Sequence, residues 1–175
     1  MGELSEANHK GRQYHISGIV QGVGFRPFVY RIATANRLSG DVSNSADGVR
    51  IHLFGSPAAL AAFDGMLRSA PPPQAKIDQI ECAEIPFQIV TGFKILASQD
   101  DPADFLPVSP DLAICADCRK EILDPAERRF HYPFTNCTNC GPRFSIIEKI
   151  PYDRPNTPMK NFRLCRNCAG EYANP

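Results

Sequence analysis

A glycine-rich stretch near the start of the chain, GIVQGVGFRPF over residues 18–28, has the composition of an anion-binding turn. Gly22 and Gly24 have no side chain, so the backbone can bend sharply there and come close to a ligand. Between a strand and a helix, its successive backbone N–H groups and the helix N-terminus would form a concave anion site. Arg26 can add a bidentate contact to phosphate oxygens. The phosphate-binding residues that we expect are Gln21, Gly22, Val23, Gly24, Phe25 and Arg26.

This stretch does not follow the common phosphate-binding motifs. It has no Walker lysine, and no third glycine completes the G-x-G-x-x-G spacing of dinucleotide sites. The alternative is a tight structural turn with Arg26 solvated at the surface, because glycine turns are common.

Asn44 favours the phosphate site over the structural turn. It lies just before Asp47-Gly48 at the end of an expected strand, where it can face the glycine-rich loop. A neutral amide in that position can hold a water in line with a bound phosphorus. The alternative is that Asn44 starts the turn by bonding to its own backbone.

Six of the seven cysteines form three Cys-x-x-Cys pairs in the second half of the chain. The first pair is Cys115 and Cys118, and the second, Cys137 and Cys140, follows after eighteen residues. This spacing is typical of a zinc site with four thiolates, which is structural because the protein fills the tetrahedral sphere. A thioredoxin-like redox pair is the alternative, but no second βαβ pattern surrounds these cysteines.

The third pair, Cys165 and Cys168, belongs to an internal repeat. CADCRKEILDP from Cys115 and CRNCAGEYANP from Cys165 share cysteines, a glutamate and a proline at an offset of fifty residues. Cys165 and Cys168 are therefore expected to be metal ligands of a second site that is incomplete within these 175 residues.

His131 and Cys82 are further residues of metal-ligating types. His131 could replace a cysteine ligand, but its position between Phe130 and Tyr132 favours a packing role. Cys82 is isolated in an expected strand, so we expect a buried side chain that packs as a small hydrophobe.

The elements that position the loop follow the order β-α-β-β-α-β, the ferredoxin-like arrangement of an α+β fold. A strand over 13–20 precedes a helix with Pro27 in its first turn, and a hairpin is centred on Asp47-Gly48. Ser56-Pro57 starts a second helix, which the prolines at 71–73 end. Weaker strand patterns follow at 75–85 and 92–96. We expect a first domain over 12–97, a linker over 98–114 and a zinc-finger region over 115–175, with a first finger over 115–140 and an incomplete second from 165.

Composition limits the classes of partner. The chain has 19 basic and 19 acidic residues, a net charge of zero, so neither DNA nor RNA is expected as the main partner. No apolar run has the length of a membrane span, and the polar N-terminus lacks the pattern of a signal peptide. A cytoplasmic location follows, and in that reducing setting paired cysteines are more often metal ligands than disulfides.

The stretches GIVQGVGFRPFVYRIA and GDVSNSADGVRIHLFG together resemble the acylphosphatase signature over roughly residues 12 to 97. The resemblance implies that Arg26 binds the phosphoryl group of an acyl phosphate and that Asn44 positions the attacking water. Phosphoryl transfer depends mainly on placement and charge stabilisation, so no protein nucleophile is required.

An acylphosphatase unit followed by two cysteine repeats resembles the N-terminal part of the HypF family of carbamoyltransferases, which are [NiFe]-hydrogenase maturation proteins. LPVSPDLAICADC and RRFHYPFTNCTNCGPRFSI carry this second resemblance. It implies that the full-length protein uses carbamoyl phosphate and ATP, and passes the carbamoyl group to the C-terminal cysteine of a HypE-type partner on the way to the cyanide ligands. The domains for those later steps are not within these residues.

Two other functions stay open at this point. The zinc-finger region can be a protein-docking module on a non-catalytic acylphosphatase-like scaffold. The other open function is a free-standing acylphosphatase with an unrelated zinc tail. The fifty-residue repeat disfavours it.

Overall fold

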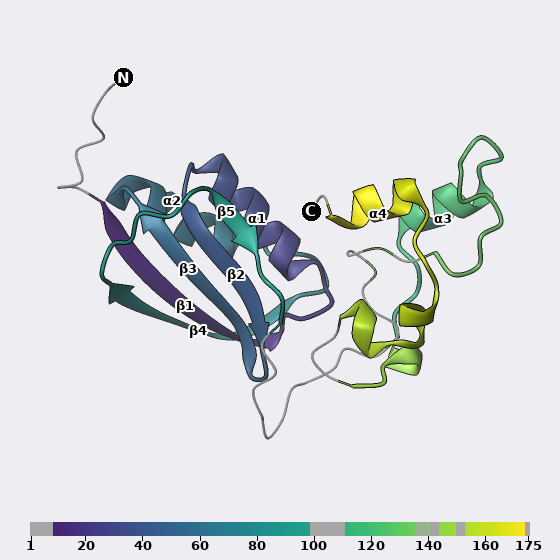
Figure 1. Ribbon diagram of the computed structural model, residues 1–175, viewed down its shortest axis with the longest axis horizontal. Helices are drawn as coiled ribbons and strands as arrows, with labels where there is room; N and C mark the ends of the chain where they lie inside the picture. The colour runs from purple at the N-terminus through teal and green to yellow at the C-terminus, as the bar shows by residue number, and fades with distance from the viewer. Residues whose placement is uncertain are drawn as a thin grey trace.

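The computed structural model describes residues 9–98, 111–135, 137, 140, 144–149 and 153–173. Figure 1 shows two parts, a sheet with two helices from the N-terminal half and a region of short helices from the C-terminal half. The linker predicted over 98–114 falls largely on residues 99–110, which lie outside the described residues.

Five strands form one sheet in the order β4-β1-β3-β2-β5. The pairings of β1 with β3 and β4, and of β2 with β3, are antiparallel, whereas β5 pairs parallel with β2. The strands are β1 (Lys10–Ile19), β2 (Ser39–Ser45), β3 (Gly48–Gly55), β4 (Lys76–Ile85) and β5 (Phe93–Ile95). With α1 (Phe25–Ala35) and α2 (Pro57–Ser69), the first four strands confirm the predicted ferredoxin-like order, and β5 adds a short edge strand.

Both helices begin where the sequence predicts, and α2 also ends as predicted. Phe25, Phe28, Val29 and Ala33 of α1 are buried, and their spacing puts them on one apolar face of the helix. The Ser56 hydroxyl caps α2 by accepting from the Ala59 amide at 3.3 Å, and the helix ends before the three prolines.

The core lies between the helices and the face of the sheet that they cover (Figure 1). Tyr14, Ile16, Val42, Ile51 and Leu53 come from the strands, alternating with more polar positions. The Tyr14 hydroxyl donates to Asp64 of α2 at 2.7 Å, and Arg12 pairs with the same carboxylate. This cluster fixes β1 against α2.

The β2–β3 turn lies one residue earlier than predicted. Ser45 pairs with Gly48, so the turn residues are Ala46 and Asp47. Gly48 is the first residue of β3, where a Cβ would lie only 2.1 Å from the carbonyl oxygen of Ile16. The glycine is needed for the close approach of β1, not for the turn itself.

The prediction that Cys82 is buried was wrong. Its side chain is exposed on β4, and most side chains of that strand are exposed or half-buried. β4 is an edge strand with a single neighbour, so strand pattern alone did not predict burial there.

The C-terminal region is built from short elements. These are α3 (Ala116–Leu123), η2 (Phe144–Ile146), η3 (Arg154–Asn156), η4 (Pro158–Asn161) and α4 (Arg166–Ala173). Among its described residues, Cys118 and Cys140 are the buried apolar side chains. Such a region has little hydrophobic core of its own. In the described part of the chain, no helix combines the length and the apolar character needed to cross a membrane.

Candidate functional site

The glycine-rich loop joins β1 to α1 and is anchored by its apolar side chains. Val20, Val23 and Phe25 are almost fully buried, so the loop is fixed to the core between its glycines. Gly22 and Gly24 have φ values of 73° and 76°, which suit glycine because they lie in the left-handed region. Both glycines are therefore required by the path of the loop.

The backbone amides of this loop are available to a ligand. Among the described residues, no backbone carbonyl accepts a hydrogen bond from the amides of residues 21–26. Gly24 is the N-cap of α1 and offers no side chain to the first turn. A run of free amides at a helix N-terminus is suited to binding an anion.

Gln21 fastens the loop to the β2–β3 turn. Its Nε2 donates to the carbonyl oxygens of Ser45 at 2.6 Å and Gly48 at 2.7 Å. These carbonyls flank the turn that follows Asn44, so Gln21 holds the loop and the Asn44 strand at the same end of the sheet. We predicted a phosphate-binding role for Gln21, but its Nε2 is used for this structural link.

Replacing Gln21 with Ala should lower the free energy of unfolding by about 1 to 3 kcal/mol, because two buried carbonyls would lose their donor. Urea denaturation of the variant and the wild type measures this loss. Gln79→Ala is the matched control, since Gln79 lies on β4 and, in the described part of the chain, its side-chain amide donates to exposed Glu81. Surface changes of that kind should stay within about 0.5 kcal/mol. Equal losses in the two variants would contradict the role given to Gln21.

Asn44 lies on β2, on the same face of the sheet as buried Val42, and its side chain is fully buried. Neither its Nδ2 nor its Oδ1 has a hydrogen-bond partner among the described residues, and the same is true of Gln21 Oε1. Buried polar atoms are nearly always paired, so unpaired ones need an explanation such as an unseen water or ligand. The alternative role, a bond from Asn44 to its own turn, is absent from the described contacts.

Arg26 is not solvated freely at the surface, because it forms a cluster with Asp153 and Ser98. Its Nη2 donates to Asp153 Oδ1 at 2.6 Å, and its Nη1 lies 3.4 Å from Ser98 Oγ. Ser98 Oγ in turn hydrogen-bonds to Asp153 Oδ2. The side chains of Arg26 and Asp153 are 20% and 22% exposed. Asp153 belongs to the C-terminal region, so the arginine of the loop contacts the second part of the molecule.

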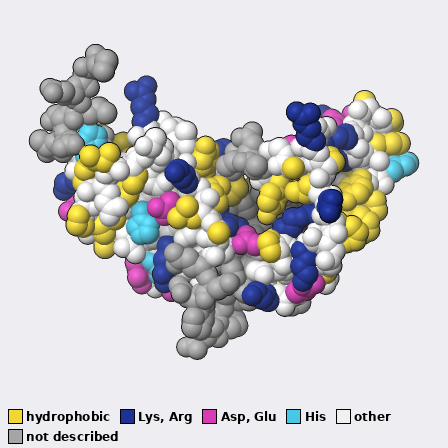
Figure 2. Space-filling model, in the orientation of Figure 1, with side chains coloured by type: hydrophobic (Ala, Val, Ile, Leu, Met, Phe, Trp, Pro, Cys, Tyr) yellow, Lys and Arg dark blue, Asp and Glu magenta, His cyan; other side chains and the backbone are white. Residues whose placement is uncertain are grey.

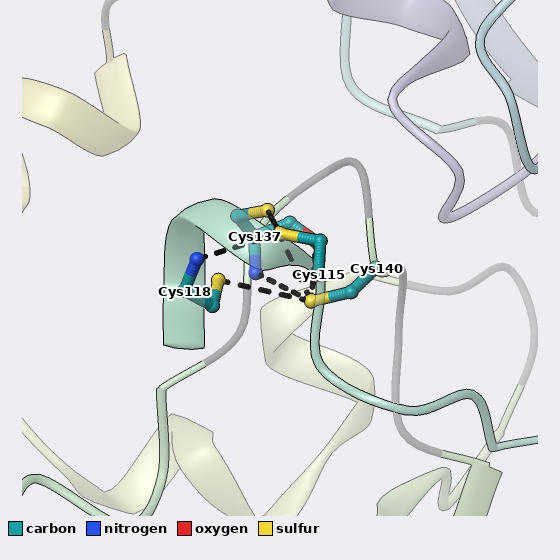
Figure 3. A group of neighbouring side chains, drawn as sticks. All are labelled: Cys115, Cys118, Cys137 and Cys140. Carbon is teal, nitrogen blue, oxygen red and sulfur yellow. Dashed lines mark hydrogen bonds between the residues drawn. The ribbon is translucent and has the colours of Figure 1, made fainter. Parts of the chain in front are cut away.

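Four cysteines of the C-terminal region form one compact cluster (Figure 3). The sulfurs of Cys115 and Cys137 are 3.5 Å apart, those of Cys118 and Cys140 are 3.8 Å apart, and those of Cys137 and Cys140 are 3.9 Å apart. A tetrahedral zinc with Zn–S bonds of about 2.3 Å requires sulfurs about 3.8 Å apart. The donor set and its spacing therefore fit a four-coordinate metal site.

Backbone amides also point at these sulfurs. The Cys118 amide donates to Cys115 Sγ at 3.5 Å, and the Cys137 amide donates to Cys140 Sγ at 3.4 Å. Burial raises the pKa of Cys140, but hydrogen bonds from Cys137, Cys115 and Cys118 outweigh it and lower the pKa to about 7. Burial raises the pKa of Cys118, and bonds to Cys137 and Cys115 raise it further. The Cys140 thiol therefore ionises easily, whereas the Cys118 thiol resists ionisation. A bound cation would favour the thiolate form of every cysteine in the cluster.

The third cysteine pair repeats the local structure of the first. Cys165 precedes α4 as Cys115 precedes α3, and the Cys168 amide donates to Cys165 Sγ at 3.4 Å. Arg129 bridges the copies by contacting Glu121 at 2.7 Å and Glu171 at 2.6 Å. These glutamates are equivalent in the fifty-residue repeat, so the repeat is visible in the structure. Cys165 and Cys168 lie outside the four-cysteine cluster.

His131 is also outside the cluster. Its ring stacks on Phe130 with the centroids 3.8 Å apart, which agrees with the predicted packing role.

Comparisons with known proteins match these two parts separately and together. The family described as Acylphosphatase matches residues 12–95, and the one described as HypF finger matches residues 114–147. The carbamoyltransferase HypF of Synechocystis is 44% identical over 148 residues, which are 85% of this chain and 19% of that protein. The chain belongs to the HypF family.

A solved HypF structure supports this membership across both parts. The crystal structure of full-length HypF in the phosphate- and nucleotide-bound form has a TM-score of 0.88 and 48% identity over 94% of this chain, which is 22% of that chain. The chain therefore spans about a fifth of the length of these HypF relatives. An acylphosphatase of Leuconostoc mesenteroides is 37% identical over 87 residues, 49% of this chain and 97% of that protein, so the first part of this HypF chain is an acylphosphatase domain.

Sequence reasoning missed Ser98, Asp153 and the Arg129 bridge. Asp153 is 127 residues from Arg26, and neither lies in a motif that links them. The fifty-residue offset between Glu121 and Glu171 in the repeat was the available signal for the bridge.

Proposed function

We propose that the acylphosphatase domain binds and hydrolyses carbamoyl phosphate, with Arg26 and Asn44 as its catalytic residues. The observation that carries this proposal is the fully buried, unpaired amide of Asn44 beside a loop whose backbone amides are free. The loop from Gln21 to Arg26 holds the phosphoryl oxygens, and the Arg26 guanidinium stabilises the negative charge that they carry.

The reaction requires the attacking water and the phosphoryl group to be positioned correctly, and it needs no protein nucleophile. The Asn44 amide holds a water in line with the phosphorus, and the water oxygen attacks as the bond from phosphorus to the carbamate oxygen breaks. The leaving carbamate is stable as an anion, so no strong general acid is needed. The products are inorganic phosphate and carbamate, and the attacking water loses a proton to solvent.

The second part of the proposal is a structural zinc ion on Cys115, Cys118, Cys137 and Cys140. Four thiolates supply all of its ligands, so the metal holds the short elements of this region together and takes no part in the reaction. Cys165 and Cys168 provide two of the ligands for a second ion.

For the whole protein we propose the role of the HypF relatives. Carbamoyl phosphate is its substrate, and a HypE-type hydrogenase maturation partner accepts the carbamoyl group on its C-terminal cysteine for the cyanide ligands of [NiFe]-hydrogenase. The location that we propose is the cytoplasm.

Replacing Asn44 with Ala tests the catalytic assignment. Turnover of carbamoyl phosphate should fall by about 10²-fold or more while KM changes little, since Asn44 contacts the attacking water. The melting temperature should not fall, because its side chain makes no hydrogen bond among the described contacts. Steady-state kinetics and a melting curve measure the two effects.

Asn36→Ala is the matched control for that experiment. The Asn36 amide donates to the Ile32 carbonyl at 2.7 Å at the end of α1, so this variant should lose stability and keep its specific activity. If Asn44→Ala behaves as Asn36→Ala does, Asn44 is a structural residue.

A docking role for the finger region is the second candidate function. Several aromatic side chains are exposed there, among them Phe134 at 70%, Phe162 at 63% and Tyr172 at 63%. Figure 2 shows hydrophobic side chains on the surface of this part of the molecule. Exposed apolar groups of this kind are typical of protein interfaces. Wild-type protein that binds neither inorganic phosphate nor carbamoyl phosphate would favour docking over catalysis.

A further inference from the structure

The guanidinium of Arg26 already binds an anion, the carboxylate of Asp153. The contact joins Arg26 Nη2 to Asp153 Oδ1 at 2.6 Å, and the second carboxylate oxygen bonds to Ser98. Both carboxylate oxygens are thus engaged, and both charged side chains are about four-fifths buried. The arrangement is one ion pair with a shared hydroxyl, not a passing surface contact.

A carboxylate and a phosphoryl group compete for the same donors. Each is an oxyanion that accepts from a guanidinium in a planar, two-point geometry. A phosphoryl dianion placed on Arg26 would also lie against the negative charge of Asp153, which disfavours having both there. Occupation of Arg26 by phosphate therefore requires Asp153 to withdraw.

The Asn44 side chain is covered in the same state. Asn44 has no exposed surface, so neither a water nor a phosphate can reach its amide from solvent without a movement. The structure thus shows the arginine paired and the asparagine covered at once.

We propose that Asp153 is an intramolecular competitor for the phosphate site, so that binding of phosphate to Arg26 displaces the Asp153 carboxylate and loosens the segment that carries it. This inference rests on the proposed function of Arg26. It assigns to the finger region a regulatory contact, in which its position sets the affinity of the phosphate site. By linkage, phosphate must weaken the contact by the same factor by which the contact weakens phosphate binding.

The test measures binding of inorganic phosphate to the 175-residue chain by calorimetry. Asp153→Asn keeps the shape of the side chain and removes its charge, so the affinity for phosphate should rise about three- to tenfold as the competing state is lost. Glu148→Gln is the matched control. It removes the same charge from the same region, and among the described ion pairs Glu148 is bound to Lys160. Arg26→Ala reports whether phosphate binds at the proposed site.

Hydrogen exchange separates competition from simple charge repulsion. In the wild type, phosphate should speed amide exchange in residues 153–161, because the contact that holds them is released. In Asp153→Asn that exchange should be fast without phosphate and unchanged by it. Glu148→Gln should respond as the wild type does.

The outcomes are distinct. In the first outcome, Arg26→Ala abolishes phosphate binding, but Asp153→Asn binds phosphate with the same affinity as the wild type and Glu148→Gln. This result would refute the competitor role of Asp153 and support the phosphate site at Arg26. Tighter binding by Asp153→Asn with no change in exchange also overturns the competitor role, in favour of repulsion alone. If Arg26→Ala binds phosphate as the wild type does, the proposed site fails, and the inference fails with it.

Discussion

Removing the metal with a strong chelator should unfold the finger region and leave the sheet domain folded. Structural zinc contributes about 10 to 16 kcal/mol to the folding of small domains, more than the few buried side chains of this region can supply. The sheet domain has its own core, and none of the four cysteines belongs to it. Circular dichroism and amide exchange before and after chelation measure the loss region by region.

Metal analysis of cysteine variants identifies the ligands. The 175-residue chain should hold one zinc tightly, and Cys118→Ser should lose it, because Cys118 is a buried member of the four-cysteine cluster. Cys168→Ser is the matched control from the equivalent position of the repeat, and it should keep that zinc. Two tightly held zinc ions per monomeric chain would mean that the cysteines are shared differently.

Replacing Arg26 with Ala should nearly abolish hydrolysis of carbamoyl phosphate. The lost charge contact in the transition state is worth about 3 to 4 kcal/mol, a decrease of about 10²- to 10³-fold in kcat/KM. Steady-state kinetics on the wild type and the variant measure it. The sheet should stay folded, because Arg26 projects from the first turn of α1 and contributes nothing to the buried core.

Arg31→Ala is the control for that variant. Arg31 lies on the same helix but is exposed, so its loss should leave kcat/KM unchanged. A variant of Arg26 that stays within a few-fold of the wild type would refute the phosphate site.

The fold of the N-terminal half was predictable because local signals agree with one another. The apolar face of α1, the Ser56 cap and the alternation in β3 each specify one element, and their order leaves few possible topologies. The exposure of β4 was not predictable in the same way. An edge strand has the same composition as an inner strand, but only one neighbouring strand covers it. Cys82 was misplaced for that reason.

The candidate site was predictable only where its residues share a motif. The cysteine spacing predicts the cluster, and the loop sequence places Arg26 beside the free amides. The partner of Arg26 depends on how the two parts of the chain pack, and Asp153 lies 127 residues away. Contacts between parts arise from tertiary packing, which leaves no periodic or spaced pattern in the sequence.

The arginine bridge between the two cysteine repeats makes them energetically dependent on each other. In arrays of short repeats, stability is the sum of what each unit supplies alone and what each junction adds. Arg129 contributes to such a junction through one glutamate from each copy, and Arg128 strengthens it through Glu171 at 2.6 Å. A repeat that lacks some of its own metal ligands can therefore stay ordered because the junction with its neighbour stabilises it. The two repeats can then differ in metal binding while they keep the junction.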